Sequence, residues 1–198
     1  NEQINKRQIL LKNINLDSNR VDRFCKICGF EHYTSGSVPA PFLQTLFINL
    51  VGRYITSDFF PFNPLGLVQI YQSFEWSRQV LPDETLTLSC ELDQIRKESK
   101  GFVSDFLCEI RSGEQIVWQG ISRYLSRTPG GPKKKKEKTE DIHLEKLETF
   151  QIQSNIGRQY ASVSGDFNPH HLYPVLAKIF GFKTAIAHGM WSLARCVG

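Results

Sequence analysis

Near the start of the chain, apolar residues recur at a helical spacing. Asp17-Ser18 are good N-cap residues and Gly29 is a good C-cap, and between them four apolar residues stand at i, i+3, i+4 and i+7: Val21, Phe24, Cys25 and Cys28. A second helix is expected after Pro39 and Pro41, with a wide apolar stripe made of Leu43, Leu46, Phe47, Leu50, Val51, Tyr54 and Ile55. A stripe of this width predicts a helix that is buried on most sides.

From Leu67 onward the apolar residues alternate with polar ones, which predicts strands instead of helices. On the first strand, four apolar residues are expected to share one face: Val68, Ile70, Phe74 and Trp76. Further strands are predicted at Leu86–Asp93, Phe102–Arg111 and Ile116–Tyr124, the last two joined by a turn at Ser112-Gly113. Clean alternation of this kind is typical of an antiparallel sheet with one buried face.

Residues 1–127 therefore combine a long apolar helix with a meander of at least four strands. A curved antiparallel sheet wrapped around the buried helix satisfies this pattern, because the helix needs apolar cover on several sides. This α+β arrangement is the hot-dog fold. Residues 128–140 contain no large apolar residue, and we interpret residues 128–146 as a basic linker.

Residues 147–198 repeat the order of the first part: helix, loop, buried helix. We expect a short strand at Phe150–Ile152, a helix capped by Asn155, a short helical piece near Tyr173–Phe180 and an apolar stretch from Met190. The pattern predicts a tandem hot-dog protein whose second repeat is incomplete. The sequence lacks an initiating Met and stops at Gly198 inside a predicted helix, so it is expected to be part of a longer protein.

Composition and charge narrow the class of protein. Hydrophobic residues make up 40% and charged residues 22% of the 198 positions, as in ordinary globular proteins, and no apolar run or signal peptide indicates a membrane span or secretion. The net charge is +4, but Lys133–Glu140 alone holds five Lys and two Glu, so no basic face for nucleic acid is indicated. Without a secretory signal, the five cysteines are interpreted as free thiols in a reducing, cytoplasmic compartment.

The polar residues with the clearest chemistry lie in residues 160–177, YASVSGDFNPHHLYPVLA. Turn-forming residues bring Asp166, Asn168 and His171 together, and a carboxylate paired with an imidazole suits general acid–base chemistry on one water at neutral pH. Farther on, Gly189 opens an apolar helix. Its backbone N–H, at the positive end of the helix dipole, is a candidate oxyanion hole.

This segment resembles the signature of (R)-specific 2-enoyl-CoA hydratases, also called hydratase 2 or MaoC-like dehydratases. Nine positions fit the signature: Tyr160, Val163, Ser164, Gly165, Asp166, Asn168, Pro169, His171 and Ala177. One departs, since His170 stands where the family has an aliphatic residue, which puts the local packing in doubt. The later Ile186–Met190 segment, IAHGM, is also similar to the family's lead into its central helix.

The resemblance implies reversible, syn hydration of trans-2-enoyl thioesters to (R)-3-hydroxyacyl thioesters, a hydro-lyase reaction without metal or redox cofactor. It implies that Asp166 is the general base on the water, that His171 orients this water and shares the proton transfers, and that Asn168 fixes the loop. The Gly189 N–H would bind the thioester oxygen, and the substrate-binding residues would be Gly165, His188 and Met190. The first repeat, which lacks the motif, would shape the acyl pocket.

The expected partner is acyl-CoA or acyl carrier protein, and the fold is compatible with a homodimer. Two alternatives stay open: a non-catalytic acyl-thioester-binding module, and an interaction protein that uses the Lys133–Lys138 tract. For single residues, simpler interpretations are favoured. His188 is expected to satisfy the core instead of acting in catalysis, His170 to face solvent or bond to the loop, and Cys25-x-x-Cys28 to pack a helix face instead of binding zinc.

Overall fold

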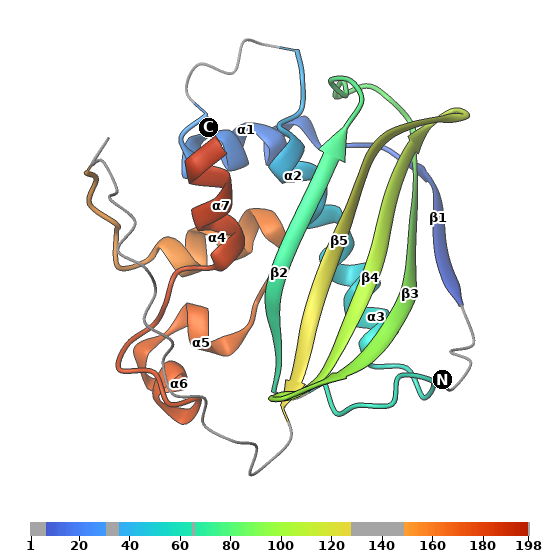
Figure 1. The fold of residues 1–198 in the computed structure, drawn as a ribbon. Coiled ribbons are helices and arrows are strands. Elements are labelled where there is room, and N and C mark those ends of the chain that lie inside the picture. The colour runs from blue at the N-terminus through green and yellow to red at the C-terminus, as the bar shows by residue number, and fades with distance from the viewer. Residues whose placement is uncertain (1–6, 31–35, 65, 128–148, 198) are drawn as a thin grey trace, which may run out of the picture.

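The sheet and its central helix form the predicted hot-dog arrangement in the computed structural model, which describes residues 7–30, 36–64, 66–127 and 149–197 (Figure 1). Five antiparallel strands lie in the order β1-β3-β4-β5-β2. They are β1 (Gln8–Ile14), β2 (Leu67–Trp76), β3 (Leu86–Glu98), β4 (Gly101–Ser112) and β5 (Gln115–Arg127). The sheet curves around a helix made of α2 (Ala40–Gln44), the 3-10 turn η1 (Thr45–Phe47) and α3 (Ile48–Ile55) (Figure 1).

Burial of the central helix confirms the predicted apolar stripe. Leu43, Phe47, Leu50 and other members of the stripe are almost fully buried, and the Phe47 ring stacks on that of Trp118 in β5 at 5.2 Å between centroids. Helix α1 (Ser18–Cys28) also begins and ends as predicted, since the Asp17 side chain accepts from the Asn19 N–H and Gly29 is left-handed with φ 78°. The first unit therefore owes its core to the 3.6-residue pattern of its helices and the alternation of its strands.

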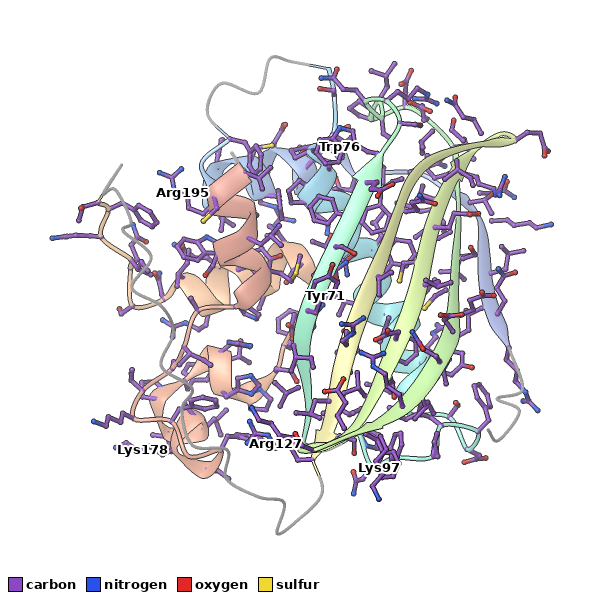
Figure 2. All side chains as sticks on the ribbon, viewed as in Figure 1. Tyr71, Trp76, Lys97, Arg127, Lys178 and Arg195 are labelled. Carbon is purple, nitrogen blue, oxygen red and sulfur yellow. The ribbon has the colours of Figure 1, made fainter. Side chains whose placement is uncertain are left out.

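Strand β2 corrects one prediction. A β-bulge shifts its register against β5 between Gln69 and Tyr71, and an extra residue exchanges the two faces of a strand. Val68 and Phe74 therefore lie on opposite faces instead of sharing one. At this edge of the sheet, Tyr71 and Trp76 are about half exposed (Figure 2). Trp118, in β5, is fully buried, in contrast to Trp76.

The C-terminal residues are helical wherever the structure assigns regular elements to residues 149–197. The helices are α4 (Ile156–Ser164), α5 (Pro169–Leu172), α6 (Pro174–Ile179) and α7 (Gly189–Val197). Helix α4 packs on α1, and α7 packs on α1 and α2. The expected strand at Phe150–Ile152 does not form, because no described strand pairs with it. The predicted linker, residues 128–146 with Lys133–Lys138, lies outside the described residues.

Two further expectations concern the whole chain. All five cysteines are free thiols, and Cys28, Cys90 and Cys108 are buried in the core. Cys28 lies on the buried face of α1 and Cys25 is partly buried against the same core, which favours packing over metal binding for this pair. Among the described helices, none combines the length and apolar character needed to cross a membrane.

Candidate active site

A left-handed turn at the end of α4 places the acid of the candidate site. Gly165 follows the helix with φ 82°, a conformation that favours glycine, and its N–H donates to the Ala161 carbonyl. Asp166 comes next, and its N–H donates to the Ser164 hydroxyl oxygen at 3.1 Å. Pro169 then starts α5 with its fixed φ. The turn thus places the Asp166 side chain directly after the end of a buried helix.

Asn168 holds the Asp166 carboxylate. Oxygen Oδ1 of Asp166 accepts from the Asn168 backbone N–H at 3.2 Å and from its side-chain Nδ2 at 2.7 Å. The other oxygen, Oδ2, lies 3.8 Å from His188 Nε2. The Asp166 side chain is 25% exposed, so a water or a small substrate can reach it. One oxygen is therefore used for orientation, and the second faces the histidines.

His171 is oriented from the opposite side by the chain before α7. Its Nδ1 lies 2.8 Å from the Ile186 carbonyl oxygen, which can only accept, so Nδ1 carries the proton in this contact. Burial, followed by the neighbouring His188, lowers the pKa of His171. A neutral ring with Nδ1 protonated presents Nε2 as an acceptor, which is the form needed to bind a water hydrogen.

His188 is 2% exposed and joins the other two residues. Its Nε2 donates to the Asp166 backbone carbonyl at 3.0 Å, and its ring stacks on that of His171 at 3.8 Å between centroids. The Tyr160 ring covers it at 5.0 Å. Burial lowers the pKa of His188. Its Nδ1 is buried without a hydrogen-bond partner among the described residues, so the contacts satisfy only one nitrogen of a histidine that lies beside the predicted pair.

Gly189 and Met190 follow His188 at the start of α7. The Gly189 N–H is at the first helical position, where the helix itself offers no acceptor and its dipole favours negative charge. The His188 carbonyl accepts from the Ser192 N–H at 3.1 Å, which fixes the first turn. Gly189 is exposed and Met190 is partly buried against the core. The predicted oxyanion donor therefore lies one residue from the histidine that contacts Asp166.

His170 lies in a different environment from the one predicted. It is half-buried, and its ring packs against Phe180 at 5.5 Å and Phe182 at 5.6 Å between centroids. The flat imidazole packs on these two rings at the position where the motif would carry an aliphatic residue. Its backbone carbonyl accepts from the Ile186 N–H at 3.2 Å, next to the bond from His171. The departure from the motif thus leaves the loop packed.

Gly157, in the first turn of α4, was missed by the sequence analysis. A Cβ at this position would lie 1.8 Å from the His171 carbonyl oxygen, so only glycine permits the approach of α5. Arg158 adds a hydrogen bond from Nη1 to the Leu172 carbonyl at 3.0 Å. A glycine inside a helical pattern often marks such a close approach, and this was the one available signal.

The donor atoms also allow a test for metal binding. One ligand atom each from Asp166, His171 and His188 lies within 4.8 Å of the others. The two imidazole rings stack with their planes 25° apart. One nitrogen of each ring faces a backbone carbonyl. The spacing of the three groups is compatible with a cation as well as with proton transfer at a water.

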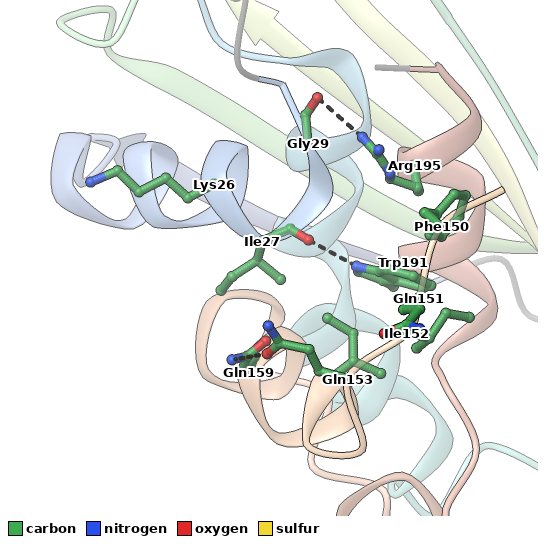
Figure 3. Close-up of a pocket in the computed structure, with 11 residues that line it drawn as sticks. Lys26, Ile27, Gly29, Phe150, Gln151, Ile152, Gln153, Gln159, Trp191 and Arg195 are labelled. Atoms are coloured by element: carbon green, nitrogen blue, oxygen red, sulfur yellow. Dashed lines mark hydrogen bonds between the residues drawn. The ribbon is translucent and has the colours of Figure 1, made fainter. Parts of the chain in front are cut away.

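A separate cavity of about 420 Å³ lies between the end of α1, residues 150–153, α4 and α7 (Figure 3). Trp191 Nε1 donates to the Ile27 carbonyl at 3.0 Å across it, and Arg195 Nη1 to the Gly29 carbonyl at 3.4 Å. None of Asp166, His171 and His188 lines this cavity. It belongs to the contact between α1 and α7 and not to the candidate active site.

Comparison with known proteins finds a family match for the C-terminal part of the chain and similar proteins along most of it. Residues 132–198 match the family described as MaoC like domain. A 3-hydroxyacyl-thioester dehydratase X of Mycobacterium tuberculosis is 25% identical over 98% of this chain and 69% of its own length. A probable enoyl-CoA hydratase 2 of Dictyostelium discoideum is 26% identical over 82% of this chain, which spans 62% of that relative.

Solved structures agree on the fold. The crystal structure of HtdX of Mycobacterium tuberculosis matches 97% of this chain and 75% of its own with a TM-score of 0.82 and 23% identity. A MaoC-like dehydratase from Phytophthora capsici matches 98% of this chain and 75% of its own with a TM-score of 0.70 and 19% identity. Residues 132–198 therefore belong to the MaoC-like dehydratase domain family, and the chain is homologous to MaoC-like dehydratases, whose hot-dog fold it shares.

Proposed function

We propose that this protein is a hydro-lyase that adds water reversibly to trans-2-enoyl thioesters and forms (R)-3-hydroxyacyl thioesters. The observation that carries the proposal is the oriented pair of Asp166 and His171. Asn168 holds one oxygen of the acid, and the Ile186 carbonyl holds Nδ1 of the imidazole. The relatives are named as a 3-hydroxyacyl-thioester dehydratase and a probable enoyl-CoA hydratase, which supports the same reaction class.

In the proposed mechanism, one water lies between Oδ2 of Asp166 and Nε2 of His171. Asp166 takes a proton from this water while the water oxygen bonds to C3 of the enoyl thioester. The electron pair of the double bond moves toward the thioester carbonyl, and the Gly189 N–H stabilises the resulting enolate oxygen. The proton then passes to C2 with His171 sharing the transfer, so one H and one OH are added on the same face. No metal or redox cofactor enters these steps.

The remaining assignments belong to the same proposal. Residues 1–127 are a non-catalytic hot-dog repeat that shapes the acyl pocket, residues 128–146 a linker, and residues 147–198 the opening of a second repeat that carries the motif. Both α1 and α4 end in a left-handed glycine, which supports the duplication. The substrate carrier is CoA or acyl carrier protein, Gly165, His188 and Met190 bind the substrate, and the protein acts in the cytoplasm, with a homodimer as its assembly.

Turnover of a short trans-2-enoyl-CoA by the full natural protein tests the proposal, with chiral analysis of the product. We expect (R)-3-hydroxyacyl-CoA, and loss of turnover in His171→Ala. His170→Leu is the matched control, since it removes the neighbouring imidazole but keeps the apolar contact with Phe180 and Phe182. An (S) product would refute the stereochemistry. Binding of the thioester without turnover would favour an acyl-thioester-binding module instead.

A further inference from the structure

A side chain from the first unit reaches the end of the helix that precedes Asp166. Arg20, on α1, donates from Nε to the Val163 carbonyl at 2.6 Å and from Nη2 to the Ser164 carbonyl at 3.3 Å. These carbonyls lie in the last turn of α4. A guanidinium at this position satisfies carbonyls that the helix leaves unpaired and opposes the negative end of its dipole.

The first unit also holds Arg20 itself in place. Its Nη2 donates to the Thr45 hydroxyl oxygen at 3.1 Å, and that hydroxyl donates to the Phe42 carbonyl at 2.7 Å. The guanidinium lies 5.3 Å from the centre of the Phe42 ring, within the range of a cation–π contact. Thr45 is 2% exposed and Phe42 1% exposed. The Arg20 guanidinium that binds α4 is therefore held by residues of the core helix of the first unit.

The bound carbonyls belong to the residues two and three positions before the candidate acid. Ser164 uses its carbonyl for Arg20 and its hydroxyl for the Asp166 N–H, so a displacement of the end of α4 is passed directly to the acid. The Asp166 carbonyl in turn binds His188, which stacks on His171. A shift at Arg20 is thus expected to move both members of the pair.

An equivalent contact at the other helix provides a comparison. The end of α1 is bound by α7, because Trp191 donates to the Ile27 carbonyl and Arg195 to the Gly29 carbonyl (Figure 3). After Gly29 the chain continues with the buried Phe30, which has no acid–base chemistry. Each unit therefore supplies an arginine to the end of the other unit's helix, but only Arg20 acts on a helix that leads to Asp166.

We propose that Arg20 is a positioning residue for the hydration reaction, through which the first unit sets the place of Asp166 and His171. The inference rests on the proposed function. It gives the first unit a part in the chemistry in addition to its proposed part in the acyl pocket.

The test compares Arg20→Gln with Arg195→Gln, a matched loss of an arginine from the end of each helix, in the full natural protein. Arg20→Gln should lower kcat on the order of 10- to 100-fold with little change in KM, because misplacement of about 1 Å can cost about 100-fold. Arg195→Gln should leave kcat near the wild-type value. Thr45→Val, which removes one anchor of Arg20, should lower kcat in the same direction but less, and remains informative if Arg20→Gln does not fold.

A double variant separates positioning from general destabilisation. In an Asp166→Asn background, Arg20→Gln should have little further effect on kcat, since the group that it positions is already lost. A full multiplicative loss would overturn the positioning role. An unchanged kcat in Arg20→Gln, or equal losses in Arg20→Gln and Arg195→Gln, would overturn it as well.

Amide hydrogen exchange decides the inference even if the protein hydrates no thioester. Loss of a hydrogen bond to a charged donor should raise exchange at the Gly165 and Asp166 amides about tenfold in Arg20→Gln. In Arg195→Gln these amides should stay unchanged. An inactive wild type with this exchange pattern would refute the proposed function alone, whereas unchanged exchange in Arg20→Gln would refute the contact's role.

Discussion

Gly157→Ala should damage the candidate active site while it leaves the fold intact. The added Cβ would lie 1.8 Å from the His171 carbonyl oxygen, whereas real Cβ atoms essentially never approach closer than 3.0 Å. The backbones of His171 and α4 must therefore separate by at least 1.2 Å, the difference between these two distances, and we expect the short α5 that carries His171 to move. Such a shift is more than the 2.8 Å bond between His171 Nδ1 and the Ile186 carbonyl can absorb. We expect kcat to fall on the order of 100-fold.

Helix propensity favours the same substitution, so the expected loss of kcat is separated from a loss of stability. Alanine is favoured over glycine inside a helix by up to about 1 kcal/mol, so part of the strain on the fold is offset. Gly52→Ala, in α3, is the matched control because, apart from the neighbouring backbone of its own helix, no described atom lies within 4 Å of its added Cβ. It should raise the free energy of unfolding by up to about 1 kcal/mol and leave kcat unchanged.

The assay is the hydration rate of a short trans-2-enoyl-CoA, measured with the thermal unfolding midpoint of each variant. If α4 gives way instead of His171, Gly157→Ala will lower the midpoint and keep its kcat. A wild-type kcat in Gly157→Ala would refute the reasoning that this glycine sets the place of His171.

Three other predictions follow from the same geometry. Asp166→Asn or His171→Ala should each lower kcat by roughly 10²–10⁴, and the double variant should lose far less than the product, because both groups act on one water; additive losses in log kcat would argue against a shared water. Because the pKa of His171 is lowered, kcat should hold below pH 6.5 and fall only on further acidification. The free energy of unfolding should decline as pH falls below 6.5, because the unfolded histidine then binds a proton that the folded one does not. A pH titration of kcat and of the free energy of unfolding checks both. Asp105→Asn weakens the 2.7 Å contacts with Arg96 and Arg123 and should destabilise the sheet by roughly 1.5–3 kcal/mol in denaturant unfolding, with kcat of the folded protein unchanged.

Local patterns predicted the helices of the first unit and strands β2 to β5, because each pattern is set by residues close in sequence, but they did not predict β1. The cap residues Asp17 and Gly29 and the turn at Gly113 needed no knowledge of the fold. The bulge in β2 could not be predicted in this way, since the extra residue is defined only by pairing with β5. The expected strand at Phe150–Ile152 failed for the same reason, because a strand needs a partner and the described residues provide none there.

In the candidate site, too, contacts between neighbours in sequence could be predicted and contacts between distant residues could not. The motif named Asp166, Asn168 and His171, and the structure brings Asn168 onto the Asp166 carboxylate as a contact between near neighbours in sequence. His188 reaches the site only because the chain returns after more than fifteen residues. Its stack with His171 is not reflected in the spacing of apolar residues along the sequence. Arg20 is farther still in sequence, and nothing near it distinguishes it from a solvated arginine on a helix.

The contacts between the two parts of the chain explain why a motif within one segment is not a site by itself. Helix α5 has four residues, none of them fully buried, and α6 has six, of which only Ala177 is buried, so they cannot hold His171 by their own packing. Their place is set by the approach to Gly157 on α4, and α4 is set in turn by Arg20 and by the packing of Tyr160 against Phe24, whose ring centroids lie 6.1 Å apart. The order of dependence runs from the core of the first unit to α4 and only then to the acid and the imidazole. Substitutions at the Phe24–Tyr160 contact should therefore affect kcat even though neither residue is proposed to touch the substrate.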